Sequence, residues 1–272
     1  IDSLFISLLP LFSIFNIADS VHETLIIYNM GHIEHFRNSG PFWEPGAFAG
    51  YIMIAIIFLH FNSDIYNKKR KLFFLILALI TTLSTTGFIA IVFFLFFYYY
   101  KDIKNVVFKI TIAVVLLYGS YYAYTSLDFL GDKIEHQLSM AAGVEAYGTN
   151  VDTQRFLNIL RDFEDFKGHE LVGRGSNPLT RYSYMPEEQI RTVGLTDIIV
   201  KNGLPFFLLM MYFLYRSMCY IVFNKNIKKD SWNCYVSFFT TLIVLMSEVY
   251  FNFPLFWAFL FIFTISKKGK SI

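Results

Sequence analysis

The sequence predicts an all-α fold, a polytopic bundle of transmembrane helices with one long extracytoplasmic loop that contains an amphipathic helix. Three observations support this prediction. Of the 272 residues, 55% are hydrophobic and 16% are charged, whereas about 25% of residues are charged in a typical soluble domain. Apolar runs recur with lengths near the ~20 residues of a bilayer crossing. Clusters of lysine and arginine flank the longest runs. A soluble globular domain is excluded, because one core could not bury so much apolar surface.

Three apolar runs are candidate spans, the first of them slightly short, and a fourth is a partial span at the N-terminus. In chain order they are a partial span Leu4–Ile17, then Gly46–Phe61, Val106–Tyr124 and Leu204–Val222. Two further runs, Leu72–Tyr100 and Trp232–Ile265, are too long for one span. Each has a polar centre, Ser84–Gly87 in the first and Glu248–Pro254 in the second, so each is a candidate hairpin of two spans.

The basic clusters decide between one span and a hairpin, because cytoplasmic loops are enriched in Lys and Arg. The clusters are Lys68–Lys71, Lys101–Lys104, Lys225–Lys229 and Lys267–Lys270. Only hairpins put every cluster on the cytoplasmic side. The prediction is therefore eight crossings with a cytoplasmic C-terminus.

This topology divides the chain into three parts. Residues 1–124 hold transmembrane helices with a short external loop at 18–45, residues 125–203 form the extracytoplasmic loop, and residues 204–272 hold the C-terminal transmembrane helices. Because the chain begins with Ile1 inside an apolar run, we interpret it as a fragment that lacks upstream spans.

The long loop contains two predicted helices. Asp152–Lys167 is amphipathic, with Phe156, Leu160 and Phe163 on one face, which we expect to lie against the bundle or the membrane interface. On the other face Asp162, Glu164 and Asp165 are expected to be solvated. A second helix, Thr192–Asn202, is expected to end at Gly203 and Pro205.

Polar residues of unusual type gather on the predicted outer side. The segment Arg37–Gly46 is the most specific, because it places a guanidinium and the carboxylate of Glu44 at the mouth of a span. Charges at membrane depth are costly and are functional candidates by default. The alternative is a surface loop in which Trp43 anchors the chain at the interface.

The segment resembles the Arg…Gly…Glu-Pro signature of the O-antigen ligase and polymerase superfamily, which are bacterial integral-membrane glycosyltransferases. Arg37, Gly40 and Glu44-Pro45 stand at the matching positions. Ser84–Gly87 resembles the family's Ser-Arg-Thr-Gly turn between two spans, with Thr85 in the place of the arginine.

The resemblance continues through the external loop. Arg155 resembles the loop arginine before the family's amphipathic segment, and Leu171–Gly175 resembles the Gly-x-Gly that follows it. Val193–Gly203 is similar to the segment that leads into the next span. Ligases carry a histidine there and this chain has none, which favours the polymerase branch.

The resemblance implies a polymerase of a bacterial surface polysaccharide, either lipopolysaccharide or capsule, in the inner (cytoplasmic) membrane with its active face outside. Donor and acceptor would be polyprenyl-pyrophosphate-linked oligosaccharides, and a chain-length regulator protein would be a further partner. Neither a cofactor, a metal nor nucleic acid is expected. A ligase and a lipid-linked-sugar flippase remain alternatives.

Chemistry assigns roles to the candidate residues. Arginine suits a pyrophosphate leaving group through its permanent charge and forked donors. A sugar hydroxyl benefits from a carboxylate base, for which Glu44 is the first candidate and Glu248 the reserve. The expected catalytic residues are Arg37, Glu44 and Arg155, converging on one external cavity. The expected substrate contacts are Arg174, Arg181, Arg191, Trp43 and Glu248, and the structural motif positions are Gly40, Pro45, Gly87, Gly173 and Gly175.

Overall fold

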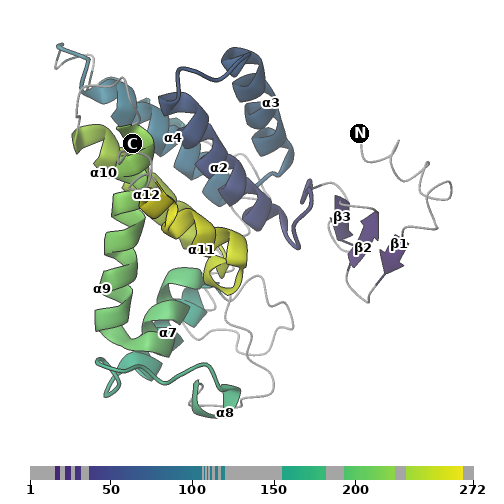
Figure 1. Ribbon diagram of the computed structural model, residues 1–272, viewed down its shortest axis with the longest axis vertical. Coiled ribbons are helices and arrows are strands. Elements are labelled where there is room, and N and C mark those ends of the chain that lie inside the picture. The colour runs from purple at the N-terminus through teal and green to yellow at the C-terminus, as the bar shows by residue number, and fades with distance from the viewer. Residues whose placement is uncertain are drawn as a thin grey trace, which may run out of the picture. The chain divides into compact units, whose positions relative to one another are not determined.

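The computed structural model is mainly helical, as predicted (Figure 1). It describes residues 16–18, 22–25, 28–31, 37–105, 155–181, 193–223 and 231–265, with some helical positions between 107 and 119. The chain forms two compact units, one of Ile1–Phe94 with Tyr212–Ile272 and the other of Leu95–Met211. Each unit is described by itself below.

A small antiparallel sheet departs from the all-α prediction. Strands β1 (Asn16–Ala18), β2 (His22–Leu25) and β3 (Tyr28–Gly31) pair in that order. Ile17 lies opposite Thr24, and Glu23 lies opposite Met30. The predicted partial span Leu4–Ile17 therefore ends in a strand, because Asn16 and the polar residues after it interrupt the apolar run; residues 4–15 lie outside the described part of the chain.

Helix α2 (Pro45–Phe61) matches the predicted span Gly46–Phe61 and packs against α3 and α10. Pro45 occupies its first turn, where the missing N–H costs no hydrogen bond. Gly50 is required by packing, because a Cβ there would collide with the Tyr250 hydroxyl. Tyr250 is fully buried, and its hydroxyl donates to the Gly46 carbonyl over 3.0 Å.

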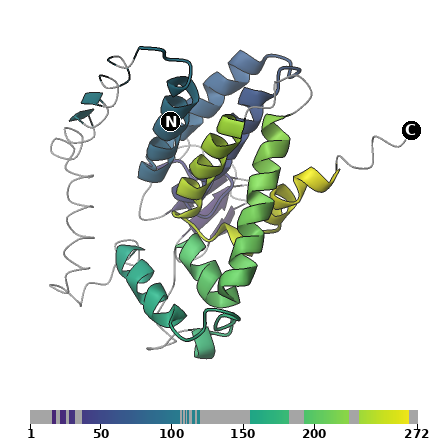
Figure 2. The same ribbon diagram turned by 90° about the vertical axis from the view of Figure 1, so that its left-hand side faces the viewer.

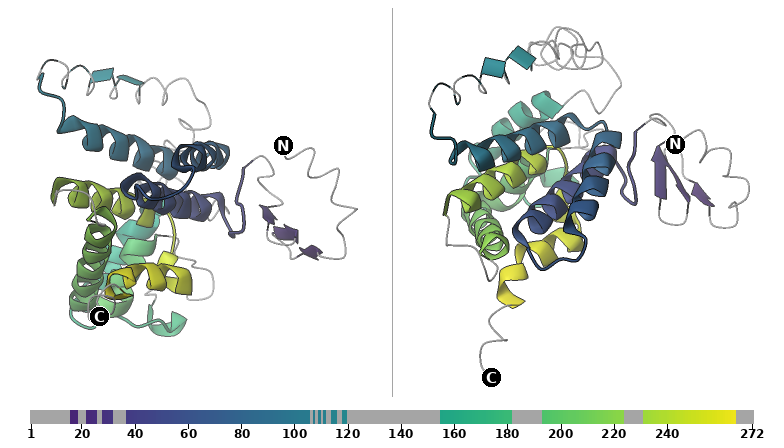
Figure 3. Two further views of the ribbon diagram at one scale, coloured as in Figure 1. Left: turned by 45° about the horizontal axis from the view of Figure 1, so that its top comes forward. Right: turned by 90° about the horizontal axis from the view of Figure 1, so that it is seen from above.

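The first long run is broken at its polar centre, as predicted, into α3 (Lys68–Thr81) and α4 (Thr85–Tyr100) (Figures 1 and 3). Ser84 caps α4, since its Oγ accepts a hydrogen bond from the Gly87 N–H over 3.3 Å. At Gly87 a Cβ would lie 3.0 Å from both Ala49 Cβ and Leu79 Cδ1. The absence of a side chain at this position therefore lets α2, α3 and α4 approach closely.

The second long run is also broken where predicted. Helix α10 (Ser231–Leu245) is followed by a turn, the 3₁₀ helix η3 (Tyr250–Asn252), α11 (Pro254–Leu260) and α12 (Ile262–Ile265). Within the same unit, Ser217 Oγ donates to the Leu260 carbonyl over 2.7 Å.

Helix α9 (Gly194–Val222) contains a kink at Gly203, with φ 79° and ψ 169°, just before Pro205 (Figure 2). The predicted boundary between a short helix and the span Leu204–Val222 is confirmed by this kink. Among the described residues, α9 is long and apolar enough to cross a membrane, and α2, α4 and α10 are apolar but shorter. Eight crossings stay a prediction, since most of Val106–Tyr124 lies outside the described residues.

Candidate functional site

Two motifs that are far apart in the sequence meet in the first unit. Arg37 Nε donates to the Thr82 carbonyl over 3.2 Å. The next residue, Asn38, donates its backbone N–H to the Thr81 carbonyl over 3.0 Å and its Nδ2 to Thr81 Oγ1 over 2.8 Å. Because these threonines end α3 and lead into the Ser84–Gly87 turn, the arginine motif and the turn motif form one structure.

The segment between Arg37 and α2 has a defined conformation. Gly40 has φ +55°, and a Cβ there would lie 2.8 Å from the Phe48 ring. Its N–H donates to Asn38 Oδ1 over 3.0 Å. Both its conformation and the close contact explain why this motif position needs glycine.

Trp43 stacks on Phe253, with ring centroids 3.9 Å apart and planes 12° apart. This contact joins the motif segment to the turn between α10 and α11. The indole is half-buried. The part of the indole that is not covered by Phe253 is therefore accessible near the start of α2.

Two carboxylates lie around Gly46 at the start of α2. Glu248 Oε1 is 3.1 Å and Glu44 Oε1 is 3.6 Å from the place where a Gly46 Cβ would be. Glu248 is buried, with 4% of its surface exposed, and Glu44 is half-buried. The positive end of the helix dipole favours negative charge at such a position. Glycine at position 46 leaves the room that the two groups occupy.

This geometry supports acid–base chemistry. A carboxylate in a half-buried setting can accept a proton from a bound hydroxyl, and the Arg37 side chain belongs to the same folded segment. The structure thus brings Arg37, Glu44, Trp43 and Glu248 into one unit, together with Gly40, Pro45 and Gly87.

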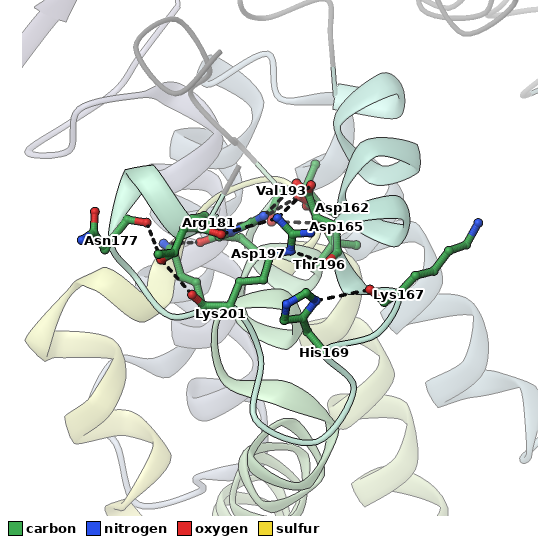
Figure 4. Close-up of polar contacts among 12 residues, drawn as sticks. Asp162, Asp165, Lys167, His169, Asn177, Arg181, Val193, Thr196, Asp197 and Lys201 are labelled. Carbon is green, nitrogen blue, oxygen red and sulfur yellow. Dashed lines mark hydrogen bonds and ion pairs between the residues drawn. The ribbon is translucent and has the colours of Figure 1, made fainter. Parts of the chain in front are cut away.

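The second unit contains a buried charge cluster around Arg181 (Figure 4). Arg181 ends α8 (Pro178–Arg181), and its side chain is 1% exposed. It donates to Asp162 Oδ1 over 2.6 Å, to Asp165 Oδ2 over 3.1 Å and to Asp197 Oδ1 over 3.1 Å. Lys201 Nζ lies 2.6 Å from the other oxygen of Asp197.

Burial by itself lowers the pKa of Arg181, but the charges of Asp162 and Asp197 outweigh it and raise the pKa above its ordinary value. Arg181 therefore stays charged at every relevant pH. Its contacts join α7 (Arg155–Phe166), α8 and the first part of α9. This geometry favours a structural role for Arg181 over the predicted contact with substrate.

Helix α7 forms where predicted, and its acidic face differs in part from the prediction. Asp162 and Asp165 are 1% and 2% exposed, so they are not solvated as predicted, whereas Glu164 is exposed as predicted. Leu160 and Phe163 are 41% and 56% exposed, so they do not pack against the described helices, and their contact with the membrane interface stays a prediction. The reason is the partner at Arg181, 16 to 19 residues away, which makes burial of the acidic face favourable.

The predicted Gly-x-Gly motif explains the kink of α9. A Cβ at Gly173, where φ is +74°, would lie 2.5 Å from the Lys201 carbonyl oxygen. At the kink, the Leu204 N–H donates to the Glu170 carbonyl over 2.7 Å. In return, the N–H groups of Arg174 and Gly175 donate to the carbonyls of Val200 and Lys201 over 2.8 and 2.9 Å. The loop thus replaces the hydrogen bonds that the helix loses at Gly203-Leu204-Pro205.

The sequence predicts that three other arginines, Arg174, Arg155 and Arg191, belong to the site. Arg174 donates its Nε to the Asp165 carbonyl over 2.7 Å and is partly exposed. Arg155 is the first residue of α7, and its side chain lies outside what the structure describes, as does Arg191. Convergence of Arg37, Glu44 and Arg155 therefore stays a prediction. Among the described residues, no group of three or more His, Cys, Asp or Glu side chains could hold a metal ion.

Sequence reasoning missed the role of Asp162, Asp165 and Asp197. The available signal was the spacing of Asp162 and Asp165, which places both carboxylates on one face of a helix. Comparison of the chain with models of protein families, with curated proteins and with solved structures gave no match.

Proposed function

We propose that this chain is a membrane glycosyltransferase that polymerises a bacterial surface polysaccharide at the outer face of the inner membrane. The observation that supports this most is the pair of carboxylates, Glu44 and Glu248, at the start of α2. Glu44 lies in the segment whose arginine, Arg37, is fixed to the Thr82 carbonyl beside the second motif. A base for the acceptor hydroxyl and a cation for the leaving pyrophosphate are what glycosyl transfer from a pyrophosphate requires.

The helices support a membrane setting. Beyond α9, the outer faces of α3 and α4 are apolar: Phe73 is 62% exposed, Phe74 53% and Ile89 54%. A soluble monomer rarely exposes contiguous apolar surface of this kind. Lipid contact removes the cost of that exposure.

The proposed reaction transfers the growing glycan from its polyprenyl pyrophosphate to a lipid-linked repeat unit. The acceptor hydroxyl oxygen attacks the anomeric carbon of the donor and forms the new glycosidic bond. The bond between that carbon and the pyrophosphate oxygen breaks, and its electron pair leaves with the pyrophosphate. The hydroxyl proton passes to a carboxylate.

The burial of the two carboxylates separates their roles. Glu44 is the more accessible, so it is the proposed base, and Glu248 is the buried carboxyl group on the other side of Gly46. Arg37 binds the pyrophosphate charge as it develops. Trp43, stacked on Phe253, presents an aromatic surface to a sugar ring.

The test replaces these groups in a host whose own gene is deleted. We expect Glu44→Gln and Arg37→Ala to reduce chain extension by about 10²–10³, the usual effect of losing a transition-state contact, with a normal protein level. Arg37→Lys should rescue only partly, since a point charge lacks the fork. Asp64→Asn, an exposed acidic residue beyond the other end of α2, is the matched control.

Gel analysis of surface glycan separates the outcomes. Loss of long chains with one repeat retained supports a polymerase. Loss of all attached repeats while long lipid-linked glycan accumulates would instead show a ligase, and loss of lipid-linked units from the outer face would show a flippase. Normal chain length in both Glu44→Gln and Arg37→Ala would refute the proposed site.

A further inference from the structure

The loop that follows α7 exposes two apolar side chains. Leu171 is 76% exposed and Val172 is 81% exposed. Polar residues flank them, His169 and Glu170 on one side and Arg174 on the other. An apolar tip between polar neighbours is the pattern of a segment that sits at the boundary between water and lipid.

The backbone holds this tip in a fixed position. Four hydrogen bonds surround it: the Leu204 N–H donates to the Glu170 carbonyl, the Gly173 N–H to the His169 carbonyl, and the N–H groups of Arg174 and Gly175 to the carbonyls of α9. The close approach of Gly173 and Gly203 to the opposite backbone leaves no room for a side chain at either position. The two apolar side chains are therefore exposed because the backbone conformation of this loop is fixed by hydrogen bonds.

The tip is tied to the point where the apolar part of α9 begins. Leu204 is 40% exposed, Leu208 57% and Leu209 47%. These residues form the outer surface of the helix that is long and apolar enough to cross a membrane. The hydrogen bond from the Leu204 N–H to the Glu170 carbonyl thus holds the exposed apolar tip next to the start of the exposed apolar surface of α9.

We propose that Leu171 and Val172 insert into the lipid at the membrane interface and anchor the external loop there. The occupant of this surface is the boundary between headgroups and acyl chains of the outer leaflet, and the argument is the continuity with α9. The inference rests on the proposed function only in so far as α9 crosses the membrane. It implies that the loop which is held by the Arg181 cluster lies at the depth of a lipid-linked pyrophosphate.

The test measures depth, not activity. A nitroxide is attached at Val172→Cys in the full chain, reconstituted in vesicles of phosphatidylethanolamine and phosphatidylglycerol. The matched control is Ser176→Cys, an exposed polar position four residues further along the same loop. Cys219 and Cys234 are free thiols, so wild-type protein treated with the same reagent gives the background.

Oxygen partitions into lipid, so we expect it to accelerate the relaxation of the Val172 label more than that of the Ser176 label. A water-soluble nickel chelate should accelerate the relaxation of the Val172 label less. The Ser176 label should show the reverse. Equal exposure of both labels to the chelate would overturn the proposal. Dipolar broadening that disappears when labelled protein is diluted with unlabelled protein would also overturn it, because the surface would then contact a second copy. Failure of the Glu44 experiment leaves this depth measurement unaffected.

Discussion

Replacement of Arg181 by alanine should strongly destabilise the segment that joins α7, α8 and the start of α9. The side chain is 1% exposed and contacts three buried carboxylates, on Asp162, Asp165 and Asp197. Removing one partner of a buried ion pair costs about 3–5 kcal/mol, because the other charge stays buried. Lys201 still neutralises Asp197, and Arg174 lies 3.9 Å from Asp165. Since these cations do not replace the guanidinium at the centre of the cluster, we expect a loss of ~3 kcal/mol.

Two further variants define the cause. Arg181→Lys keeps the charge, but an ammonium is compact and cannot reach three carboxylates with a planar fork, so we expect partial recovery. Lys167→Ala, an exposed residue just after the end of α7, is the matched control. Its effect should stay within about 0.5 kcal/mol, as for most surface substitutions.

Limited trypsin digestion of the purified protein in detergent measures the loop directly, with thermal unfolding as the second readout. We expect rapid cleavage after Arg161, Lys167 and Arg174 in Arg181→Ala and slow cleavage at these sites in wild type. In Lys167→Ala, which lacks the second site, cleavage after Arg161 and Arg174 should stay slow. If Arg181 instead contacts substrate, Arg181→Ala will resist trypsin like the wild type while chain extension is lost. That result would refute the structural assignment of the cluster.

Two other predictions concern packing and pH. Gly50→Ala should lower the unfolding temperature, because the new methyl group collides with the Tyr250 hydroxyl, and adding Tyr250→Phe should recover part of the loss; no recovery would contradict the assigned clash. Glu170 accepts a hydrogen bond over 2.8 Å from the N–H of Gly168, which lowers the pKa of its carboxyl below the ordinary 4.5. The contribution to turn stability is therefore complete above pH 4.5 and lost as the pH falls through the lowered pKa. The amide proton shift of Gly168 should follow this titration, and Glu170→Gln should abolish it.

The sequence predicts the breaks between helices well because each break has a local chemical cause. Pro205 removes a backbone donor and Gly203 adopts a positive φ, so the end of one helix and the start of the next could be placed to the residue. The break at Ser84 follows from a polar turn whose serine caps the next helix. Such signals act within a few residues of the place that they determine.

The pairing within the candidate site could not be predicted in the same way. Glu44 and Glu248 are far apart in the chain, and they meet because Gly50 admits Tyr250 to the surface of α2. No periodicity in either segment encodes that contact. From their chemistry both carboxylates are candidates for the catalytic base, but only the fold shows that they lie close together.

Helix α7 shows why periodicity alone is ambiguous. The spacing of its residues establishes two faces of different polarity, but polarity alone does not say which face is buried. In water the apolar face turns inward, whereas next to lipid charged groups face the protein interior and pair with one another. Burial of Asp162 and Asp165 against Arg181, with Leu160 and Phe163 outward, follows the second arrangement. The outward position of Leu160 and Phe163 therefore fits the proposal that this loop lies against lipid, as does the exposed tip at Leu171.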